Sequence, residues 1–208
     1  MTDSVSRPST TSDLTAIVLA AGSSRRMGEA NKLLLPFRGE PIVRQAVLAA
    51  TSAPVRAVVV VTGHERAHVE EVLTGTSARL VHNPDYESGM ASSLRTGVAA
   101  APDGASGFMI LLGDMPLIGM DTLALLAHHF EDLPPRAILI ATTDGRRGHP
   151  VVFDAAYRTD LLRLDGDVGA RPIIEANREH VVEVDVDDPG IFRDVDTQAA
   201  YRALQTEA

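Results

Sequence analysis

The chain has 208 residues, a formal net charge of −9 and 45% apolar residues, which is typical of one globular domain with a core of its own. The negative charge argues against a nucleic-acid-binding protein, because phosphate contacts require a basic face. The chain contains no cysteine, which excludes disulfides, thiolate metal sites and a cysteine nucleophile, and favours a cytoplasmic location.

Residues 1–12 are rich in serine and threonine and lack an apolar stretch. They predict a disordered tail and not a signal peptide, which leaves 13–208 as the folded domain. No apolar run approaches the roughly 18 residues that a membrane span requires. We therefore expect no contact with a membrane.

The first two thirds of the chain alternate apolar β-type runs with helical patterns. Strands are expected at Thr15–Ala20, Val55–Val61, Arg79–His82, Phe108–Leu112 and Ala137–Ala141. Helices are expected at Pro41–Ala50, Glu65–Leu73, Ser88–Ala100 and Asp121–Phe130. This rhythm predicts a single α/β domain of Rossmann-like type, in which a mostly parallel central sheet carries helices on both faces.

The pattern becomes less regular after residue 143. The remaining elements are a segment at Gly148–Phe153, two short helices around Ala155–Leu164 and Ala170–Asn177, a strand at Val181–Val186 and a closing helix at Thr197–Leu204. We interpret these elements as a layer appended to the same domain, and not as a second domain.

The first strand runs into a loop rich in glycine and serine that ends in three cations, Arg25, Arg26 and Lys32. Backbone N–H groups at residues 22–24 and 28 can point at phosphate oxygens, and the cations can neutralise charge on a phosphoryl group in transit. The alternative is an ordinary strand-to-helix loop with solvated cations.

Two familiar phosphate loops do not fit these residues. A Walker loop requires Gly-Lys before Ser or Thr, whereas Gly28 is followed by Glu29. A dinucleotide fingerprint requires a glycine where Ser24 stands and an acid about 20 residues later, and 41–50 contains no acid. The chain is therefore not a P-loop ATPase, and NAD binding is a weak alternative.

Polar segments follow the third and fourth strands, at 83–90 and 113–116. Ligands of open parallel sheets bind at the carboxyl ends of the strands, so these segments should lie near the loop. Asp114, at a strand end and beside a glycine, is suited to hold Mg²⁺ that bridges a triphosphate. The alternative is that Asp114 caps a turn before Pro116.

Several motifs occur in a fixed order along the chain. They are Leu-Ala-Ala-Gly-x-Ser-x-Arg-Met-Gly at 19–28, Asn-Lys-Leu-Leu at 31–34, Gly39-x-Pro41, Asn83-Pro84, Gly89-Met90-x-x-Ser93-Leu94, Gly-Asp-Met-Pro at 113–116, Gly-His-Pro-Val at 148–151 and Gly-Asp-x-Gly-Ala-Arg at 166–171. From residue 14 to the end, this set resembles the molybdenum cofactor cytidylyltransferase family. That family belongs to the MobA-like nucleotidyltransferases, which have the GT-A-like fold of the nucleotide-diphospho-sugar transferases.

The resemblance implies that CMP is transferred from CTP to the terminal phosphate of the molybdenum–pterin cofactor, with release of pyrophosphate. Mg²⁺ or Mn²⁺ would be required, and a molybdenum hydroxylase is a possible recipient of the product. A substrate phosphate is already an anionic nucleophile, so no side chain has to be activated. Catalysis then consists of alignment and charge stabilisation.

The resemblance also assigns roles to residues. Arg26, Lys32 and Asp114 would form the catalytic set, and Arg25 stands at a variable position. The nucleotide would be bound by Leu19, Ala20, Ala21, Gly22, Ser23, Ser24, Arg25, Arg26, Lys32, Gly89, Ser93 and Asp114. A second alanine at 21, where guanylyl-transferring relatives usually carry glycine, favours a pyrimidine. Ser93 alternatively does no more than occupy the first turns of a helix.

The second metal ligand would come from Asp194 and Asp196, which resemble an Asp-x-Asp-Thr segment. Alternation along a strand places both on one face, and Asp196 is either a metal ligand with Asp114 and Asp194 or the N-terminal cap of the last helix. The acceptor would be bound by His149, Asp167 and Arg171, although His149 alternatively serves a structural turn. The nearby acids at 185, 187 and 188 are expected to be solvated.

Two other functions fit the same sequence. One is a nucleotidyltransferase with a sugar or polyol phosphate as acceptor, or with GTP as donor. The other is a non-catalytic accessory protein that binds the cofactor for a molybdenum hydroxylase. Retention of Arg26, Lys32, Asp114 and Asp194 argues against the second, because a pure binding module does not need the charge-stabilising set.

Overall fold

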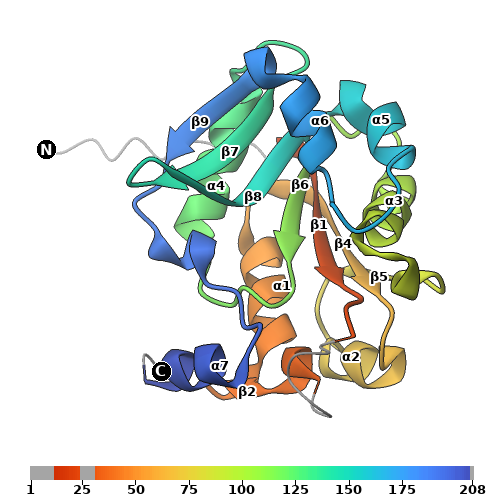
Figure 1. Ribbon diagram of the computed structural model, residues 1–208, viewed down its shortest axis with the longest axis vertical. Coiled ribbons are helices and arrows are strands. Elements are labelled where there is room, and N and C mark those ends of the chain that lie inside the picture. The colour runs from red at the N-terminus through yellow and green to blue at the C-terminus, as the bar shows by residue number, and fades with distance from the viewer. Residues whose placement is uncertain (1–11, 24–30, 207–208) are drawn as a thin grey trace, which may run out of the picture.

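The computed structural model describes residues 12–23 and 31–206, and a seven-stranded sheet with the order β5-β4-β1-β6-β8-β7-β9 forms its centre (Figure 1). The strands are β1 (Ser12–Ala20), β4 (Val55–Thr62), β5 (Arg79–His82), β6 (Gly107–Leu112), β7 (Ile138–Thr143), β8 (Arg146–Asp154) and β9 (Val181–Asp185). Only β8 runs antiparallel to its two neighbours. The expected mostly parallel sheet is therefore confirmed.

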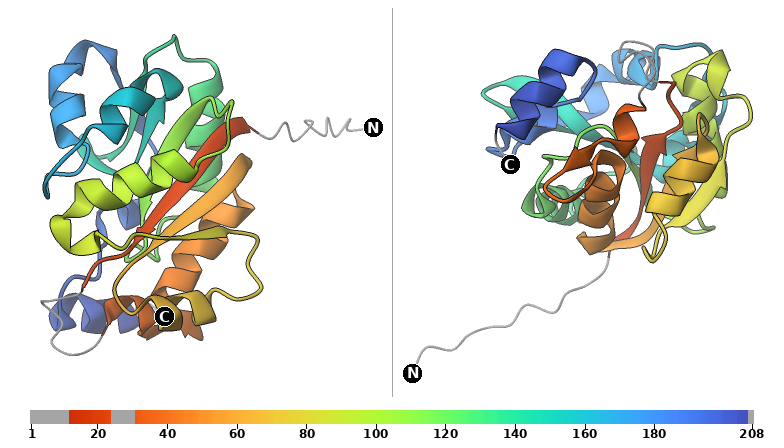
Figure 2. Two further views of the ribbon diagram at one scale, coloured as in Figure 1. Left: turned by 90° about the vertical axis from the view of Figure 1, so that its right-hand side faces the viewer. Right: turned by 90° about the horizontal axis from the view of Figure 1, so that it is seen from below.

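Helices cover both faces of the sheet, as the two views of Figure 2 show. They are α1 (Ile42–Ser52), α2 (Arg66–Val72), α3 (Met90–Ala100), α4 (Met120–Glu131), α5 (Arg158–Leu162), α6 (Arg171–Ala176) and α7 (Gln198–Gln205). One core packs under α1, α2 and α4, and the other packs under α3, α5 and α6. In the described ranges, no helix is both long and apolar enough to cross a bilayer.

The central strand β1 explains why the first apolar run is continuous. Val18 packs in the core under α1, whereas its neighbour Ile17 packs in the core under α3, and both are fully buried. A parallel strand that is covered on both faces has no solvent-facing side, so it carries no alternating polar residues. β1 begins at Ser12, whose backbone N–H donates to the Pro54 carbonyl at 2.8 Å. The remainder of the expected tail, 1–11, lies outside the described residues.

The interpretation of the C-terminal third as an appended layer is wrong. β8 lies inside the sheet between β6 and β7, and β9 forms one edge beside β7. The β7–β8 hairpin turns at Asp144 and Gly145, which have φ of 53° and 71°. This Asp-Gly pair matches the two-residue turn that joins antiparallel strands. The antiparallel insertion breaks the βαβ rhythm without ending the sheet.

Short elements complete the fold. They are the β2 (Pro36–Phe37) and β3 (Glu40–Pro41) pair and the 3₁₀ helices η2 (Lys32–Leu34), η3 (Tyr86–Ser88), η4 (Ala155–Tyr157), η5 (Arg178–His180) and η6 (Pro189–Phe192). A small third core joins the first turn of α1 to α7 through Ile42 and Leu204, with Val195 between them. This core fixes the segment that precedes α7 beside the start of α1.

Candidate functional site

Two cavities of about 530 Å³ each lie side by side, at and beyond the carboxyl ends of β1 and β6. Leu19, Met90 and Leu112 line both cavities and form a ridge between them. We call the first the charged cavity; its lining residues are Leu19, Ala21, Gly22, Ser23, Lys32, Leu33, Tyr86, Glu87, Ser88, Gly89, Met90, Ser93, Leu112, Asp114, Asp167, Asp194 and Asp196.

We call the second the apolar cavity, and it lies over the face of β6, β7 and β8. Its lining residues are Leu19, Met90, Leu94, Ile110, Leu112, Ile140, Arg147, Gly148, His149, Val151, Phe153, Val168, Gly169, Ala170, Arg171, Ile174, Glu175 and Arg178.

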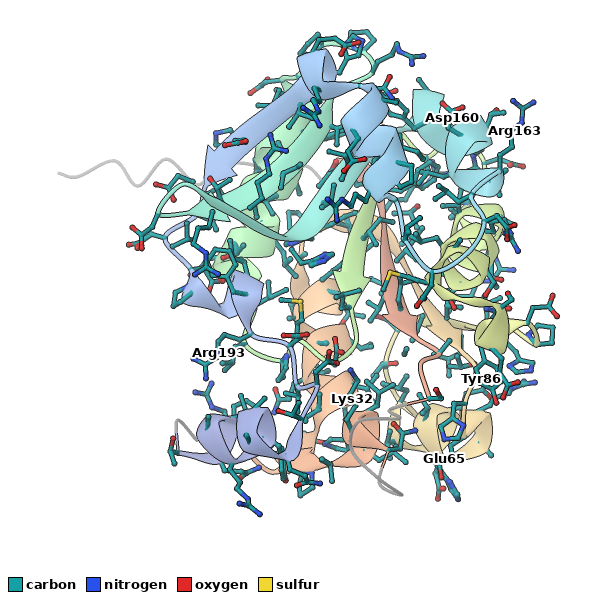
Figure 3. All side chains as sticks on the ribbon, viewed as in Figure 1. Lys32, Glu65, Tyr86, Asp160, Arg163 and Arg193 are labelled. Carbon is teal, nitrogen blue, oxygen red and sulfur yellow. The ribbon has the colours of Figure 1, made fainter. Side chains whose placement is uncertain are left out.

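Lys32 and Asp114 meet in the charged cavity although 82 residues separate them. The Lys32 ammonium donates to Asp114 Oδ2, and also to Asp196 Oδ1 at 2.5 Å. Figure 3 shows Lys32 just beyond the ends of β1 and β6, and Tyr86 lies to the right of Lys32 in this view. Lys32 is the only lysine of the chain.

Backbone hydrogen bonds hold these side chains in place. Asn31 caps η2 by accepting from the Leu33 N–H at 3.1 Å, and η2 begins at Lys32. The Val195 N–H donates to the Asp114 carbonyl at 3.0 Å, which ties the segment before α7 to the end of β6. The site is therefore built by three segments that are far apart in sequence.

Asp194 and Asp196 both line the charged cavity, as expected from their spacing. They do not lie on a strand, because 193–196 is irregular. Val195 is buried between them in the third core, and an extended backbone then directs both neighbours to the opposite side. The cap of α7 is Thr197, which accepts from the Ala200 N–H at 3.1 Å. Asp196 is thus not the helix cap.

The charges in this cavity shift one another's titration. Burial by itself lowers the pKa of the Lys32 ammonium, but attraction and hydrogen bonding to Asp114 and Asp196 outweigh it, so the pKa of Lys32 is raised. Partial burial raises the pKa of the Asp194 carboxyl, and the negative charges of Asp196 and Asp114 raise it further. A cation added to this cavity would relieve that repulsion.

The donor set fits a divalent cation. Among the residues that the structure describes, Asp114 Oδ1 is buried and has no hydrogen-bond partner, which leaves a carboxylate oxygen available as a ligand. In 12–23 and 31–206, no group of three or more acids, histidines or cysteines forms a ready metal cluster. Mg²⁺ commonly takes only one or two carboxylates and completes its shell with substrate phosphates and water, so the charged cavity suits it when nucleotide is bound.

The described start of the glycine-rich loop lines the charged cavity. Leu19, Ala21, Gly22 and Ser23 line it, whereas Ala20 is 1% exposed and packs in the core under α1. Side chains alternate between the faces of a strand, so Ala20 cannot face the same side as Leu19 and Ala21. The predicted site residues Ser24, Arg25 and Arg26 lie outside the described residues.

Asp167 belongs with the charged cavity, and not with the other two residues expected to bind the acceptor. Its Oδ1 accepts from the backbone N–H of Met90 at 3.0 Å, at the first turn of α3. Gly89 has φ of 112°, and a Cβ there would lie 2.5 Å from the Gly166 carbonyl oxygen. The segment containing Asp167 therefore packs tightly against the start of α3, where Gly89 and Ser93 line the charged cavity.

His149 and Arg171 line the apolar cavity. His149 lies within β8 and not in a turn. Its ring Nδ1 is buried and has no hydrogen-bond partner in the described part of the chain, and burial lowers the pKa of the ring. Arg171 is largely exposed and pairs with Glu175 at 2.8 Å. Arg147 and Arg178 also line this cavity. No local pattern predicted these two arginines, because isolated arginines have no distinguishing pattern.

Asp188 has a structural role that the sequence did not indicate. Its Oδ2 accepts from the Gly119 N–H at 2.9 Å and from the Thr122 hydroxyl at 2.6 Å, and its Oδ1 accepts from the Gly190 N–H at 2.8 Å. These bonds fasten the start of α4 to η6. For Asp188, the expectation of a solvated acid is therefore wrong.

The arrangement is similar to that of known proteins. A profile described as the MobA-like NTP transferase domain matches residues 16–182. Nicotine blue oxidoreductase of Paenarthrobacter nicotinovorans is 32% identical over 92% of this chain and 96% of its own length.

Two solved structures are also similar. A nucleotidyl transferase from Methanothermobacter thermautotroptrophicus has a TM-score of 0.81 and 26% identity, covering 93% of this chain and 96% of its own. Rv0371C of Mycobacterium tuberculosis H37Rv in complex with manganese has a TM-score of 0.80 and 27% identity, covering 94% and 99%.

Proposed function

The chain belongs to the MobA-like NTP transferase family, and from that premise we propose that it transfers CMP from CTP to the terminal phosphate of the molybdenum–pterin cofactor, with release of pyrophosphate. The observation that carries the proposal is the meeting of Lys32, Asp114 and Asp196 in one cavity beside the glycine-rich loop. A triphosphate is the substrate class that needs a lysine and a carboxylate-held cation at the same place.

The lysine, three of the aspartates and the start of the loop in the charged cavity then have distinct roles. Lys32 donates to phosphate oxygens as charge develops at the α-phosphorus, and the backbone of Gly22 and Ser23 approaches the phosphates closely. Asp114 and Asp194 would hold Mg²⁺ or Mn²⁺, with Asp196 keeping Lys32 in position. The ion, when bound, neutralises phosphate charge and orients the leaving pyrophosphate. The manganese complex of the M. tuberculosis relative supports a divalent cation of this kind.

The apolar cavity supports the choice of acceptor. Its floor is formed by aliphatic and aromatic side chains, among them Ile110, Ile140 and Phe153, and arginines stand at its edge. A sugar or polyol phosphate would lose water from its hydroxyls on such a floor without gaining hydrogen bonds. A flat heterocycle with an anionic end fits better, because the rings cover the apolar floor and Arg147, Arg171 or Arg178 pairs with the anion.

The two cavities meet at the ridge of Leu19, Met90 and Leu112. An acceptor phosphate that reaches across this ridge would approach a nucleotide α-phosphate in the charged cavity. Proximity of the two reactants supplies much of the rate enhancement in such a transfer. We place the reaction in the cytoplasm, with a molybdenum hydroxylase as the recipient of the product.

Similarity to nicotine blue oxidoreductase favours hydride transfer as a second candidate function. The apolar cavity would then hold an aromatic substrate, and a nicotinamide would have to lie beside it. Hydride transfer does not require the ion pairs of Lys32 with Asp114 and Asp196 in the neighbouring cavity. The second candidate therefore leaves the charged cavity unexplained.

The test is pyrophosphate release from each of the four NTPs with Mg²⁺ or Mn²⁺ and the molybdenum cofactor, run beside an assay of NAD(P)H oxidation. Of the four NTPs, we expect only CTP to release pyrophosphate at a high rate.

Lys32→Met should lower this rate by about 10²- to 10³-fold, as expected for loss of a preorganised charge contact. Because Lys32 is the only lysine, amine-directed labelling followed by peptide mapping reads its protection by CTP directly. NAD(P)H oxidation without pyrophosphate release would refute the proposal.

A further inference from the structure

Asn83 stands directly after β5 and is 2% exposed. Its side-chain Nδ2 donates to the hydroxyls of Ser92 at 2.8 Å and Ser93 at 3.0 Å. Its Oδ1 accepts from the backbone N–H of Asp85 at 3.0 Å. A backbone N–H only donates, so the oxygen of the amide must face Asp85 and the nitrogen must face both serines. The direction of the hydrogen bonds at Asn83 is therefore fixed by the backbone.

This direction decides what the two hydroxyls do with their own protons. Each hydroxyl accepts from Asn83, and each has one proton left to donate. The Ser92 hydroxyl donates its proton to a backbone carbonyl, either the Gly89 carbonyl at 2.8 Å or the Asp85 carbonyl at 3.0 Å. Ser93 is 6% exposed and lines the charged cavity, and within the part of the chain that the structure describes no acceptor takes its proton. The Ser93 proton is thus left for a ligand.

We infer that Asn83 is a specificity-positioning residue, which fixes the Ser93 hydroxyl as a hydrogen-bond donor toward the nucleobase. The inference rests on the proposed function, since it assigns the base of the bound nucleotide to the part of the charged cavity beside Ser93. The base atom that meets Ser93 must then be an acceptor. Cytosine presents two adjacent acceptors, O2 and N3. Uracil shares the O2 acceptor but carries an N–H at position 3, as guanine does at position 1. The inference therefore assigns the Ser93 proton to N3 of cytosine.

The difference between these bases is large enough to measure. A donor that meets another donor in a closed site leaves both groups without a partner, which costs more than a lost exposed hydrogen bond. A site built around such a bond can therefore discriminate between bases of the same size by about tenfold or more. Shape alone cannot separate cytosine from uracil, because their rings are nearly identical in volume.

Reversing the polarity of position 83 tests the inference. In Asn83→Asp the carboxylate only accepts, so Ser93 must donate to it and present a lone pair to the base. We expect the ratio of the dissociation constants for UTP and CTP, measured by calorimetry with Mg²⁺, to be about ten or more in the wild type and to fall below one in Asn83→Asp. Ser93→Ala should bring the ratio near one. Ser92→Ala is the matched control, because Ser92 bonds to the same amide but does not line the charged cavity, and it should keep the wild-type ratio.

Each outcome decides the matter. If Asn83→Asp and Ser93→Ala keep the wild-type ratio, or if Ser92→Ala shifts it as much as Ser93→Ala does, the inference is overturned. A general loss of affinity for both nucleotides with an unchanged ratio also overturns it, since that is what a merely structural role predicts. Should Asn83→Asp not fold, as judged by thermal unfolding, the two serine variants decide alone. A wild-type protein that binds no CTP refutes the proposed function itself, whereas tight CTP binding with unaltered selectivity in the variants refutes only this inference.

Discussion

The charged cavity and the apolar cavity have the same volume, about 530 Å³, and share the ridge of Leu19, Met90 and Leu112, but they are built differently. Asp114, Asp194 and Asp196 stand on irregular segments and Lys32 on the short helix η2, and a backbone hydrogen bond from Val195 to the Asp114 carbonyl ties two of these segments together. The apolar cavity lies on the faces of strands and against α6. The charged groups are thus carried mainly by loops and the short helix η2, and the apolar surface mainly by regular elements.

The largest expected effect tests the charged cavity. Asp114→Asn keeps the size of the side chain but removes the charge that attracts Lys32 and the carboxylate oxygen left for a cation. We expect kcat for pyrophosphate release to fall by about 10³-fold, because both charge-stabilising elements are weakened at once. Asp185→Asn, at an exposed position of β9, is the matched control and should leave kcat unchanged. Retention of most of the activity in Asp114→Asn would contradict the role of this carboxylate.

A second substitution tests whether the two cavities bind different substrates. Ile174→Trp adds volume to the apolar cavity, which Ile174 lines from α6. We expect KM for the molybdenum cofactor to rise by about tenfold, whereas the dissociation constant for CTP should change by less than twofold, since a filled pocket excludes only its own ligand. Leu162→Trp, at a partly exposed position of α5 outside both cavities, controls for the added indole. Equal effects on both substrates would mean that the cavities are not separate sites.

The smallest expected effect concerns how the free energy of unfolding depends on pH through His149. Burial lowers the pKa of His149 below the usual value for histidine, so the unfolded chain binds a proton at this position more readily than the folded chain. Its contribution to the free energy of unfolding is therefore fully present above about pH 6.5 and decreases as the pH falls, by at most about 1.4 kcal/mol per pH unit.

Urea unfolding between pH 7.5 and pH 5.5 measures this contribution. His149→Phe should unfold with a smaller loss of stability on acidification than the wild type. His129→Gln, on the exposed face of α4, should retain the wild-type dependence. Identical pH dependences for His149→Phe and the wild type would show that the ring is not kept neutral by burial.

Much of the fold was predictable because it depends on local pattern. The continuous apolar run of β1 and the helical periodicity of α1 and α4 placed these elements within a few residues of their observed bounds. That Lys32 and Asp114 line one cavity was predictable for the same reason, since Asp114 follows the end of β6 and Lys32 follows the loop after β1. Asn83 was visible only as part of an Asn-Pro motif, and nothing local indicated which way its amide faces.

Sequence by itself determined the parallel α/β architecture and the kinds of side chain that stand at the carboxyl edge of the sheet. Burial on two faces and turn chemistry both produce patterns among neighbouring residues, which can be recognised without the structure. Only the tertiary structure decided that β8 enters the sheet between β6 and β7, that Ala20 turns away from the cavity beside it, and that the Asn83 amide donates to the Ser93 hydroxyl. These features depend on strand order, on which face of a strand is covered and on hydrogen-bond partners. None of these is set by neighbouring residues, because each requires segments distant in sequence to come together in the folded chain.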